Sequence, residues 1–236
     1  MVSVETTLDP KANLIESLKR EGLLKSKTVE QALLSIRRED FVWPGYGASA
    51  YFDEPLPLGD TGQTISAPHM VTIMLEEAEL CPGLKVLEIG TGSGYNAALI
   101  AEIVSKRAKE IDQPLVVTIE RNAKLVQFAK ENVKRAGFEK TVQVVEGDGS
   151  LGYPQESNEM IYDRIFVTAG APFIPPFLEK QLKPEGIILV PVGEMPYQTL
   201  IKAKKVEITR KKFELKKQKL MGVMFVPLLG ESAYQP

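Results

Sequence analysis

The sequence predicts one α/β domain built on a mostly parallel, doubly wound β-sheet that carries helices on both faces. From residue 84 onward, short apolar runs alternate with segments of helical periodicity, which is typical of parallel strands joined by crossover helices. The length of 236 residues, with 44% hydrophobic and 25% charged residues, suits a globular chain with a sizeable core. We therefore expect a single domain over 1–236, in which an N-terminal helical cap with a long loop, residues 1–82, packs on a sheet core, residues 83–236.

The N-terminal cap is predicted to contain three helices and one long loop. The helices are expected at residues 9–24, 26–41 and 68–80. Asp9 is the predicted N-cap of the first helix, and Thr28 with Gln31 forms a predicted capping box in the second. The stretch 42–68 is rich in glycine, proline and aromatic residues. A loop of that length inside a compact domain is usually functional.

The sheet core is predicted from a regular alternation of strand and helix. Strands are expected at residues 84–90, 114–120, 141–149, 162–170 and 186–193, and helices at residues 95–111, 121–137 and 174–186. The last two predicted strands, around 199–210 and 219–228, have no helical pattern between them. An antiparallel pair is therefore expected at one edge of the sheet.

The charge distribution argues against nucleic acid and membranes as partners. The formal net charge is −2, which gives no overall attraction to polyanions. Residues 202–219 contain nine Lys and Arg against two Glu, but apolar and charged residues tend to alternate there and Phe213 is the only aromatic residue. A solvated antiparallel hairpin is therefore favoured over a patch that binds nucleic acid.

The numbers of cysteine and histidine residues limit the cellular compartment and the kinds of metal site that are compatible with the chain. The chain has one cysteine, Cys81, and one histidine, His69, so an internal disulfide and a zinc site built on these residue types are excluded, and no metal is expected. The first residues lack the apolar core of a signal peptide, and no apolar run approaches the roughly 18 residues of a membrane span. We expect a cytoplasmic protein, and a homo-oligomer stays open.

The stretch VLEIGTGSGYNAA is predicted to form a strand, a glycine-rich loop and the start of a helix. Gly90, Gly92 and Gly94 allow a tight turn and a close approach of the backbone to a ligand. The third glycine comes one position earlier than in the dinucleotide fingerprint, and no Gly-Lys-Ser/Thr follows, which excludes a Walker-type phosphate loop. Glu88, just before the loop, favours a ligand with an ammonium group or hydroxyls over one with phosphates.

Two further acids end the next two predicted strands. Glu120 is placed to accept hydrogen bonds from both hydroxyls of a ribose, and Asp148 to accept one from an adenine amino group. Taken alone, each acid fits an ordinary solvent-facing strand end. Together with the glycine loop, three acids at the carboxyl ends of three successive strands predict a site for S-adenosylmethionine.

On these motifs, the sequence resembles the protein-L-isoaspartate O-methyltransferases over residues 12–230, nearly the whole chain. The similar motifs are VLEIGTGSGYNAA, IE, GDG, YDRIFVTAGAP, LKPEGIILVPVG and VMFVPL, preceded by GQTISAPHM, which is close to diagnostic of the family. The resemblance implies a Rossmann-like class I methyltransferase fold. It also implies methyl transfer from S-adenosylmethionine to the α-carboxylate of L-isoaspartyl residues in damaged proteins and peptides. The methyl ester then closes to a succinimide, which opens partly to normal aspartate.

The resemblance also implies roles for individual residues. Ser66 is implied as the catalytic serine. The residues implied at the methyl-transfer and substrate pocket are Gln63, Thr64, Ile65 and His69. The residues implied at the cofactor are Glu88, Gly90, Thr91, Gly92, Gly94, Glu120, Arg121, Asp148 and Gly149. The segment LGDTGQT is one residue longer than the usual bacterial spacing, so Asp60 and Thr61 receive no role.

The implied chemistry suits a site with a serine and no strong general base. A carboxylate nucleophile has an unperturbed pKa of about 4 and is already ionised at neutral pH. Ser66 is therefore expected to hold one carboxylate oxygen by a hydrogen bond while the other oxygen attacks, and His69 either contacts the cofactor or faces solvent. Two alternatives stay open: a class I methyltransferase with another substrate (a small molecule, a protein or nucleic acid), and a non-catalytic protein that binds the cofactor. VTAGAP stands where an amino-methylation motif would lie, which argues against a nucleic-acid substrate.

Overall fold

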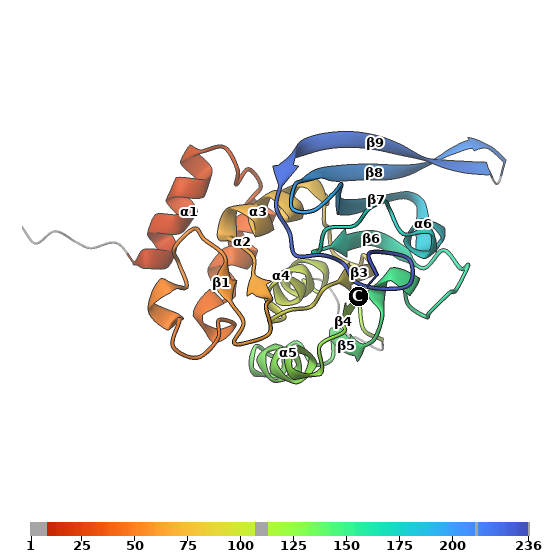
Figure 1. Cartoon of the computed structure of the whole chain (residues 1–236). Helices are drawn as coiled ribbons and strands as arrows, with labels where there is room; N and C mark the ends of the chain where they lie inside the picture. Colours follow the sequence, from red (N-terminus) through yellow and green to blue (C-terminus); the bar gives the residue numbers. More distant parts are fainter. Residues whose placement is uncertain (1–8, 107–112, 211, 236) are drawn as a thin grey trace, which may run out of the picture.

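The computed structural model describes residues 9–106, 113–210 and 212–235, and its centre is a seven-stranded sheet (Figure 1). In spatial order the strands are β5 (Val142–Glu146), β4 (Val116–Glu120), β3 (Val86–Ile89), β6 (Tyr162–Val167), β7 (Leu182–Val192), β8 (Gln198–Thr209) and β9 (Lys212–Val223). The first five run parallel, whereas β8 and β9 pair antiparallel at one edge. The predicted mostly parallel α/β sheet with an antiparallel edge pair is confirmed.

Successive residues of the central strands point alternately into two hydrophobic cores, as expected for a sheet that is covered on both faces. The described helices are α1 (Pro10–Arg20), α2 (Lys27–Ser35), α3 (Pro68–Glu77), α4 (Tyr95–Val104), α5 (Ala123–Arg135) and α6 (Pro176–Gln181). Val86 and Phe166 belong to the core that also contains residues of α1 to α5, whereas Leu87 and Ile165 belong to the core that contains α6. Within the described part of the chain, no helix is long and apolar enough to cross a membrane.

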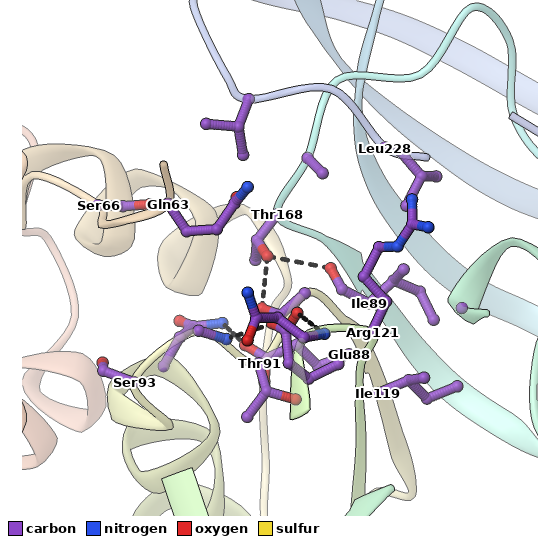
Figure 2. Close-up of a pocket in the computed structure, with 18 of the residues that line it drawn as sticks. Gln63, Ser66, Glu88, Ile89, Thr91, Ser93, Ile119, Arg121, Thr168 and Leu228 are labelled. Atoms are coloured by element: carbon purple, nitrogen blue, oxygen red, sulfur yellow. Dashed lines mark hydrogen bonds between the residues drawn. The ribbon is translucent and has the colours of Figure 1, made fainter. Parts of the chain in front are cut away.

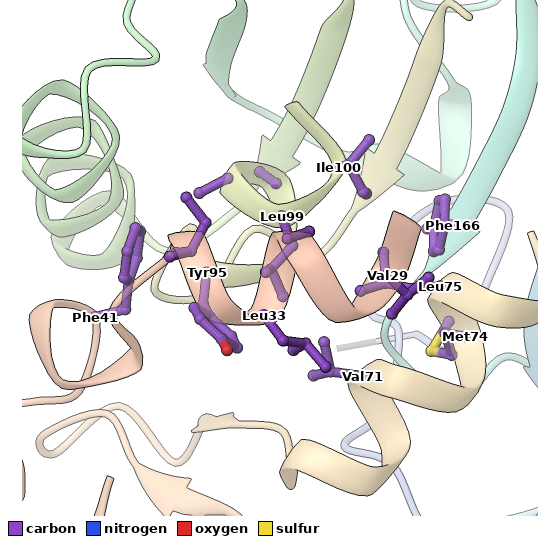
Figure 3. Packing of buried hydrophobic residues seen from close by; sticks show 14 of the residues in the cluster. Val29, Leu33, Phe41, Val71, Met74, Leu75, Tyr95, Leu99, Ile100 and Phe166 are labelled. Atoms are coloured by element: carbon purple, nitrogen blue, oxygen red, sulfur yellow. The ribbon is translucent and has the colours of Figure 1, made fainter. Parts of the chain in front are cut away.

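The N-terminal cap shares its core with the sheet. Leu33 of α2 and Leu75 of α3 belong to the same buried cluster as Leu99 of α4 and Phe166 of β6 (Figure 3). All four side chains are at most 6% exposed. The loop that follows α2 is therefore anchored close to the helix that follows the glycine loop.

The start of α2 depends on a residue distant in sequence. The predicted capping box of Thr28 and Gln31 is wrong, because Ser26 is the N-cap and its Oγ accepts a hydrogen bond from Val29 N at 3.2 Å. In a capping box, an acid or amide three residues into the helix accepts from the N-cap backbone N–H. Here Glu76 of α3 accepts from Ser26 N at 2.8 Å, so the cap is completed by a tertiary contact.

Several boundaries differ from the prediction. The hairpin predicted within 202–219 is confirmed, but β9 begins at Lys212 instead of 219 and ends at Val223 instead of reaching 228. Beyond Val223 the chain leaves the sheet, and Pro227 forms a bridge with Gly170 at the carboxyl end of β6. Strand β7 starts four residues earlier than predicted. The predicted helix 95–111 ends at Val104, and its residues 107–111 lie outside the described residues.

Candidate active site

A cavity of about 360 Å³ lies at the carboxyl ends of β3, β4 and β6. Its walls come from the glycine loop, the end of β4, the segment that contains Gln63 and Ser66, and the C-terminal segment around Leu228 (Figure 2). This is the switch point of the sheet, where β3 has β4 on one side and β6 on the other, and where α/β proteins bind their ligands. The loop before α3 and the C-terminal segment thus meet over the cofactor position predicted from the sequence.

The glycine loop is shaped by steric requirements at two positions. Gly90 has φ of +96°, and a Cβ there would lie 2.4 Å from Thr168 Oγ1. The Thr168 hydroxyl donates to the Gly90 carbonyl oxygen at 2.7 Å, which fixes the loop against β6. Gly94 has φ of +83° as the N-cap of α4, and a Cβ there would lie 3.1 Å from Val133 of α5. Glycine is required for close packing as well as for backbone conformation.

Glu88 is a fully buried carboxylate at the floor of the cavity. Its Oε1 accepts a hydrogen bond from Asn96 Nδ2 at 2.7 Å, and its Oε2 accepts one from Thr118 Oγ1 at 2.5 Å. Thr118 Oγ1 also lies 2.7 Å from Thr91 Oγ1, so a chain of side chains connects the glycine loop to Glu88. Burial raises the pKa of Glu88 to about 7, although these hydrogen bonds favour the ionised form.

Glu120 lies at the end of β4 with its side chain fixed by backbone N–H groups. Its Oε2 accepts from Gly92 N and its Oε1 from Asn122 N, each at 3.0 Å. The side chain lines the cavity and is 7% exposed. Arg121 and Gly149 line the same cavity. The structure therefore brings together Glu88, Glu120 and most of the predicted cofactor residues.

Asp148 and Gly94 are not among the described residues that line this cavity. Asp148 Oδ1 accepts from the backbone N–H and the hydroxyl of Ser150, and its Oδ2 accepts from Glu231 N at 2.8 Å. A Cβ on Gly230 would lie 2.2 Å from Asp148 Oδ1, so the C-terminal segment passes directly over this carboxylate. Asp148 thus holds the C-terminal segment in place, and its role toward adenine stays a prediction.

The segment between β1 (Leu56–Pro57) and α3 positions the predicted serine. Within this part of the chain, β1 forms a small antiparallel pair with β2 (Thr64–Ile65). Thr61 closes the turn between the two strands, because its Oγ1 donates to Leu58 O and accepts from Gln63 N. Thr61 therefore has a structural role in the lengthened segment. Asp60 forms an exposed ion pair with Lys124 of α5 at 3.0 Å.

A second cavity, of about 550 Å³, adjoins the first. Thr64, Ser66, Thr168 and Val226 line both cavities. Half-buried Ser66 follows β2 directly, whereas Gln63 and Ile65 line the first cavity only. His69 lines the second cavity, where its backbone N and its Nδ1 lie 2.8 and 2.9 Å from Asp53 Oδ1. The predicted pocket residues are therefore divided between two compartments that meet at Ser66.

Sequence reasoning missed several residues of the site, and three of them fix predicted cofactor residues. Asn96 and Thr118 fix Glu88, and Thr168 fixes Gly90. The sequence does carry a signal for the first two, because each is a polar residue inside an otherwise apolar element, YNAALIA or VVTIE. Leu228 and its neighbours at the C-terminal end carry no comparable signal, since only the return of the chain brings them to the cavity.

This sheet order, with its glycine loop and two strand-end acids beside a cavity at the switch point, is the fold of the class I methyltransferases. The chain belongs to the protein-L-isoaspartate(D-aspartate) O-methyltransferase family, whose pattern matches residues 9–233. It is 50% identical over 222 residues to the protein-L-isoaspartate O-methyltransferase of Pyrococcus horikoshii, covering 94% of this chain and 93% of that protein. Identity to the Methanopyrus kandleri enzyme is 45%, with 94% and 92% covered.

Two solved structures show the same likeness in three dimensions. One is a putative protein-L-isoaspartate O-methyltransferase from Plasmodium falciparum in complex with S-adenosyl-L-homocysteine, with a TM-score of 0.78 and 28% identity. That match covers 94% of this chain and 98% of the other. The second is a protein-L-isoaspartate O-methyltransferase with a TM-score of 0.79 and 32% identity, covering 94% of this chain and 67% of the other.

Proposed function

We propose that this enzyme transfers a methyl group from S-adenosylmethionine to the α-carboxylate of L-isoaspartyl residues in damaged proteins and peptides of the cytoplasm. The resulting ester closes spontaneously to a succinimide, which opens partly to normal aspartate. The observation that carries the proposal is the junction of two cavities at Ser66. One cavity has the walls of a cofactor site, and the other opens beside it without a glycine loop or a strand-end acid in its lining.

The residues of the first cavity fit S-adenosylmethionine. Gly90 and Gly92 line the cavity and have no side chain to fill it, and Asn96 Oδ1, at the wall, is a buried acceptor for which no described group is a donor. Ionised Glu88 suits an ammonium group, and Glu120 presents a carboxylate edge that suits ribose hydroxyls. Within the described residues, no group of three or more His, Cys, Asp or Glu side chains is placed to hold a metal. When bound, this cofactor supplies an electrophilic methyl group on a sulfonium centre.

The chain's own contribution to the reaction is mainly orientation. The substrate carboxylate is ionised at neutral pH, so no residue has to remove a proton. Ser66 Oγ donates a hydrogen bond to one carboxylate oxygen and leaves the other free to attack. Gln63, Thr64 and Ile65 form the adjoining wall. Orientation of this kind accounts for roughly 7–11 kcal/mol in favourable cases.

Matched peptides test the proposal directly. Wild-type enzyme should transfer labelled methyl to a peptide with L-isoaspartate and not to the same peptide with L-aspartate. Ser66→Ala removes one hydrogen bond to a charged group, which is worth about 1.5–3 kcal/mol, so kcat/KM should fall roughly 10- to 150-fold. The affinity for S-adenosyl-L-homocysteine should change little.

Ser17→Ala is the matched control, because Ser17 lies on α1 and bonds only locally to Glu21 and Arg20 among the described residues. It should leave both activity and cofactor affinity unchanged. A wild-type enzyme that binds the cofactor and methylates no isoaspartyl peptide would show that the substrate belongs to another class of methyl acceptor. Unchanged activity in Ser66→Ala would remove the serine from the proposed mechanism.

A further inference from the structure

Thr168 directly follows β6 and lies where the two cavities meet. Four residues line both cavities, namely Thr64, Ser66, Thr168 and Val226. A methyl group that passes from a donor in the first cavity to an acceptor in the second has to cross this junction. The side chains of these four residues therefore border its path, and Ser66 is the one already assigned to the substrate carboxylate.

The hydroxyl proton of Thr168 is used by the backbone of the glycine loop. Its Oγ1 lies 2.7 Å from the carbonyl oxygen of Gly90 and 3.0 Å from that of Ile89 (Figure 2). A carbonyl oxygen can only accept, so the hydroxyl is the donor in both contacts. Its single proton is shared between the two carbonyl groups and is not available to a ligand.

The same oxygen keeps its capacity to accept. A hydroxyl oxygen has two lone pairs, and no donor group of a described residue forms a hydrogen bond with Thr168 Oγ1. The residue is half-buried. At the junction of the two cavities, Thr168 is therefore an acceptor whose lone pairs are left for a ligand.

An oxygen that can only accept suits a cation and repels an anion. The substrate carboxylate is an anion and has no proton to donate, so Thr168 Oγ1 cannot hold it. Ser66 can, because its hydroxyl forms no hydrogen bond with a described residue and keeps its proton. The hydrogens of a methyl group on a sulfonium centre carry partial positive charge, which makes the group a weak donor toward oxygen. The two hydroxyls thus suit the two opposite charges of the reaction.

We propose that Thr168 is a catalytic residue whose Oγ1 accepts C–H···O hydrogen bonds from the methyl group of S-adenosylmethionine and aims this group at the substrate carboxylate. The proposal rests on the proposed function, because it concerns the methyl donor of that reaction. Ile89 and Gly90 contribute through their carbonyl groups, which hold the hydroxyl proton and leave only lone pairs for the methyl group. Ser66 then orients the nucleophile, and Thr168 orients the methyl group.

The test compares the affinity for S-adenosylmethionine with that for S-adenosyl-L-homocysteine, which lacks the methyl group. Thr168→Val replaces the hydroxyl with a methyl group of similar size. Loss of the bond to Gly90 should weaken both ligands alike, whereas loss of the acceptor should weaken S-adenosylmethionine alone. In calorimetry, the dissociation constant of S-adenosylmethionine divided by that of S-adenosyl-L-homocysteine should rise about 3- to 10-fold, as expected for a C–H···O contact strengthened by charge.

Three further variants control for structural effects. Thr168→Ser keeps the oxygen and should keep this ratio within about twofold of the wild type. Thr168→Ala removes the same oxygen with a smaller side chain, and it should raise the ratio even where Thr168→Val does not fold. Thr72→Val is the matched control, because Thr72 Oγ1 also donates to a backbone carbonyl, that of Pro68 at 2.9 Å, but Thr72 is not among the residues that line the two cavities. It should leave the ratio unchanged.

Nuclear magnetic resonance of the bound cofactor gives a second readout, which support of the glycine loop alone would not produce. An oxygen acceptor deshields the hydrogens that it contacts. With an isotope-labelled methyl group on S-adenosylmethionine, the methyl proton resonance should lie further downfield in the wild type and in Thr168→Ser than in Thr168→Ala. Equal methyl shifts in the three proteins would overturn the proposal.

The affinity ratios separate this proposal from the proposed function, because both ligands are measured without a methyl acceptor. An unchanged ratio in Thr168→Val and Thr168→Ala would overturn the proposal, since the hydroxyl would then only support the glycine loop. An equal rise in Thr72→Val would overturn it as well. A wild-type enzyme that gives the expected ratios and methylates no isoaspartyl peptide would overturn the proposed substrate and leave the role of Thr168 intact.

Discussion

Glu88→Gln tests whether the cofactor site lowers the stability of the cofactor-free protein at neutral pH. The Glu88 side chain is fully buried, and burial raises its pKa from an ordinary value of 4.5 to about 7. The folded protein therefore binds this proton more tightly than the unfolded chain does. The stabilisation that protonation contributes is fully present below pH 4.5 and is lost as the pH rises through about 7. Glutamine has nearly the same shape and cannot ionise.

The size of the effect follows from that interval of pH. Between pKa values of 4.5 and about 7, at about 1.36 kcal/mol for each pH unit, ionised Glu88 costs the folded state about 3 kcal/mol. Part of this loss has already occurred at pH 5. The free energy of unfolding of Glu88→Gln minus that of the wild type should therefore increase by about 2–3 kcal/mol between pH 5 and pH 8. Thr118 accommodates the amide, because its hydroxyl both donates and accepts.

The assay is urea unfolding of both proteins, free of cofactor, at pH 5 and pH 8. Taking the difference between the proteins cancels the other titrating groups, and the expected change corresponds to a midpoint shift of roughly 1 M urea. Saturating S-adenosyl-L-homocysteine at pH 8 should stabilise the wild type more than Glu88→Gln, because the ligand's ammonium group then compensates the buried charge. Glu146→Gln, at the exposed end of β5, is the control for loss of one carboxylate. An equal difference at pH 5 and pH 8 would refute the reasoning.

Two further substitutions test the glycine loop and the edge hairpin. Gly90→Ala should weaken S-adenosyl-L-homocysteine binding at least 10-fold in calorimetry, because its Cβ would lie 2.4 Å from Thr168 Oγ1. In the control variant Gly137→Ala, φ is +82° and no atom lies within 4 Å of the added Cβ. This variant should only lower the free energy of unfolding by about 1 kcal/mol, which is the cost of the backbone conformation. Lys205→Met should lower the free energy of unfolding by about 2–4 kcal/mol, because Lys205 is only 5% exposed and donates hydrogen bonds to carbonyl groups at the end of α6. Its control, Lys204→Met, removes an exposed ion pair and should lower the free energy of unfolding by less than about 1 kcal/mol. Equal losses of S-adenosyl-L-homocysteine affinity in the two glycine variants would contradict the role of the Gly90 contact. Equal losses of unfolding free energy in the two lysine variants would contradict the role of the Lys205 contacts.

The fold was predictable because its signals are local and repeated. Alternating apolar runs and helical patterns are sufficient to predict a mostly parallel sheet, and the missing helix before the last strand is sufficient to predict the antiparallel edge. The errors in predicted caps and strand ends occur where contacts between residues far apart in the sequence determine them. Glu76 completes the cap at Ser26, which no pattern within α2 could indicate. The end of β9 was misplaced because the apolar run continues past Val223, where those side chains line the two cavities instead of pairing in the sheet.

The candidate site was predictable where the motif and the sheet geometry act together. Parallel strands bring Glu88 and Glu120 to one edge, so their positions at strand ends are sufficient to place both beside the glycine loop. The sequence does not distinguish their environments. Glu88 is fully buried between Asn96 and Thr118, whereas Glu120 is fixed by backbone N–H groups at the cavity wall. These differences arise from packing and set the pKa of Glu88.

Asp148 shows why a strand-end acid cannot be assigned to a ligand from its position alone. A carboxylate just after a strand has backbone N–H groups of the chain itself within reach, and Asp148 binds those of Ser150 and Glu231. The same contact holds residues 226–229 against the cavity, because the chain between Pro227 and Glu231 is fastened at both ends. Asp148 therefore supports the C-terminal wall of the cofactor site. Its role toward adenine, which its place at the end of a strand predicts, is a separate claim and stays a prediction.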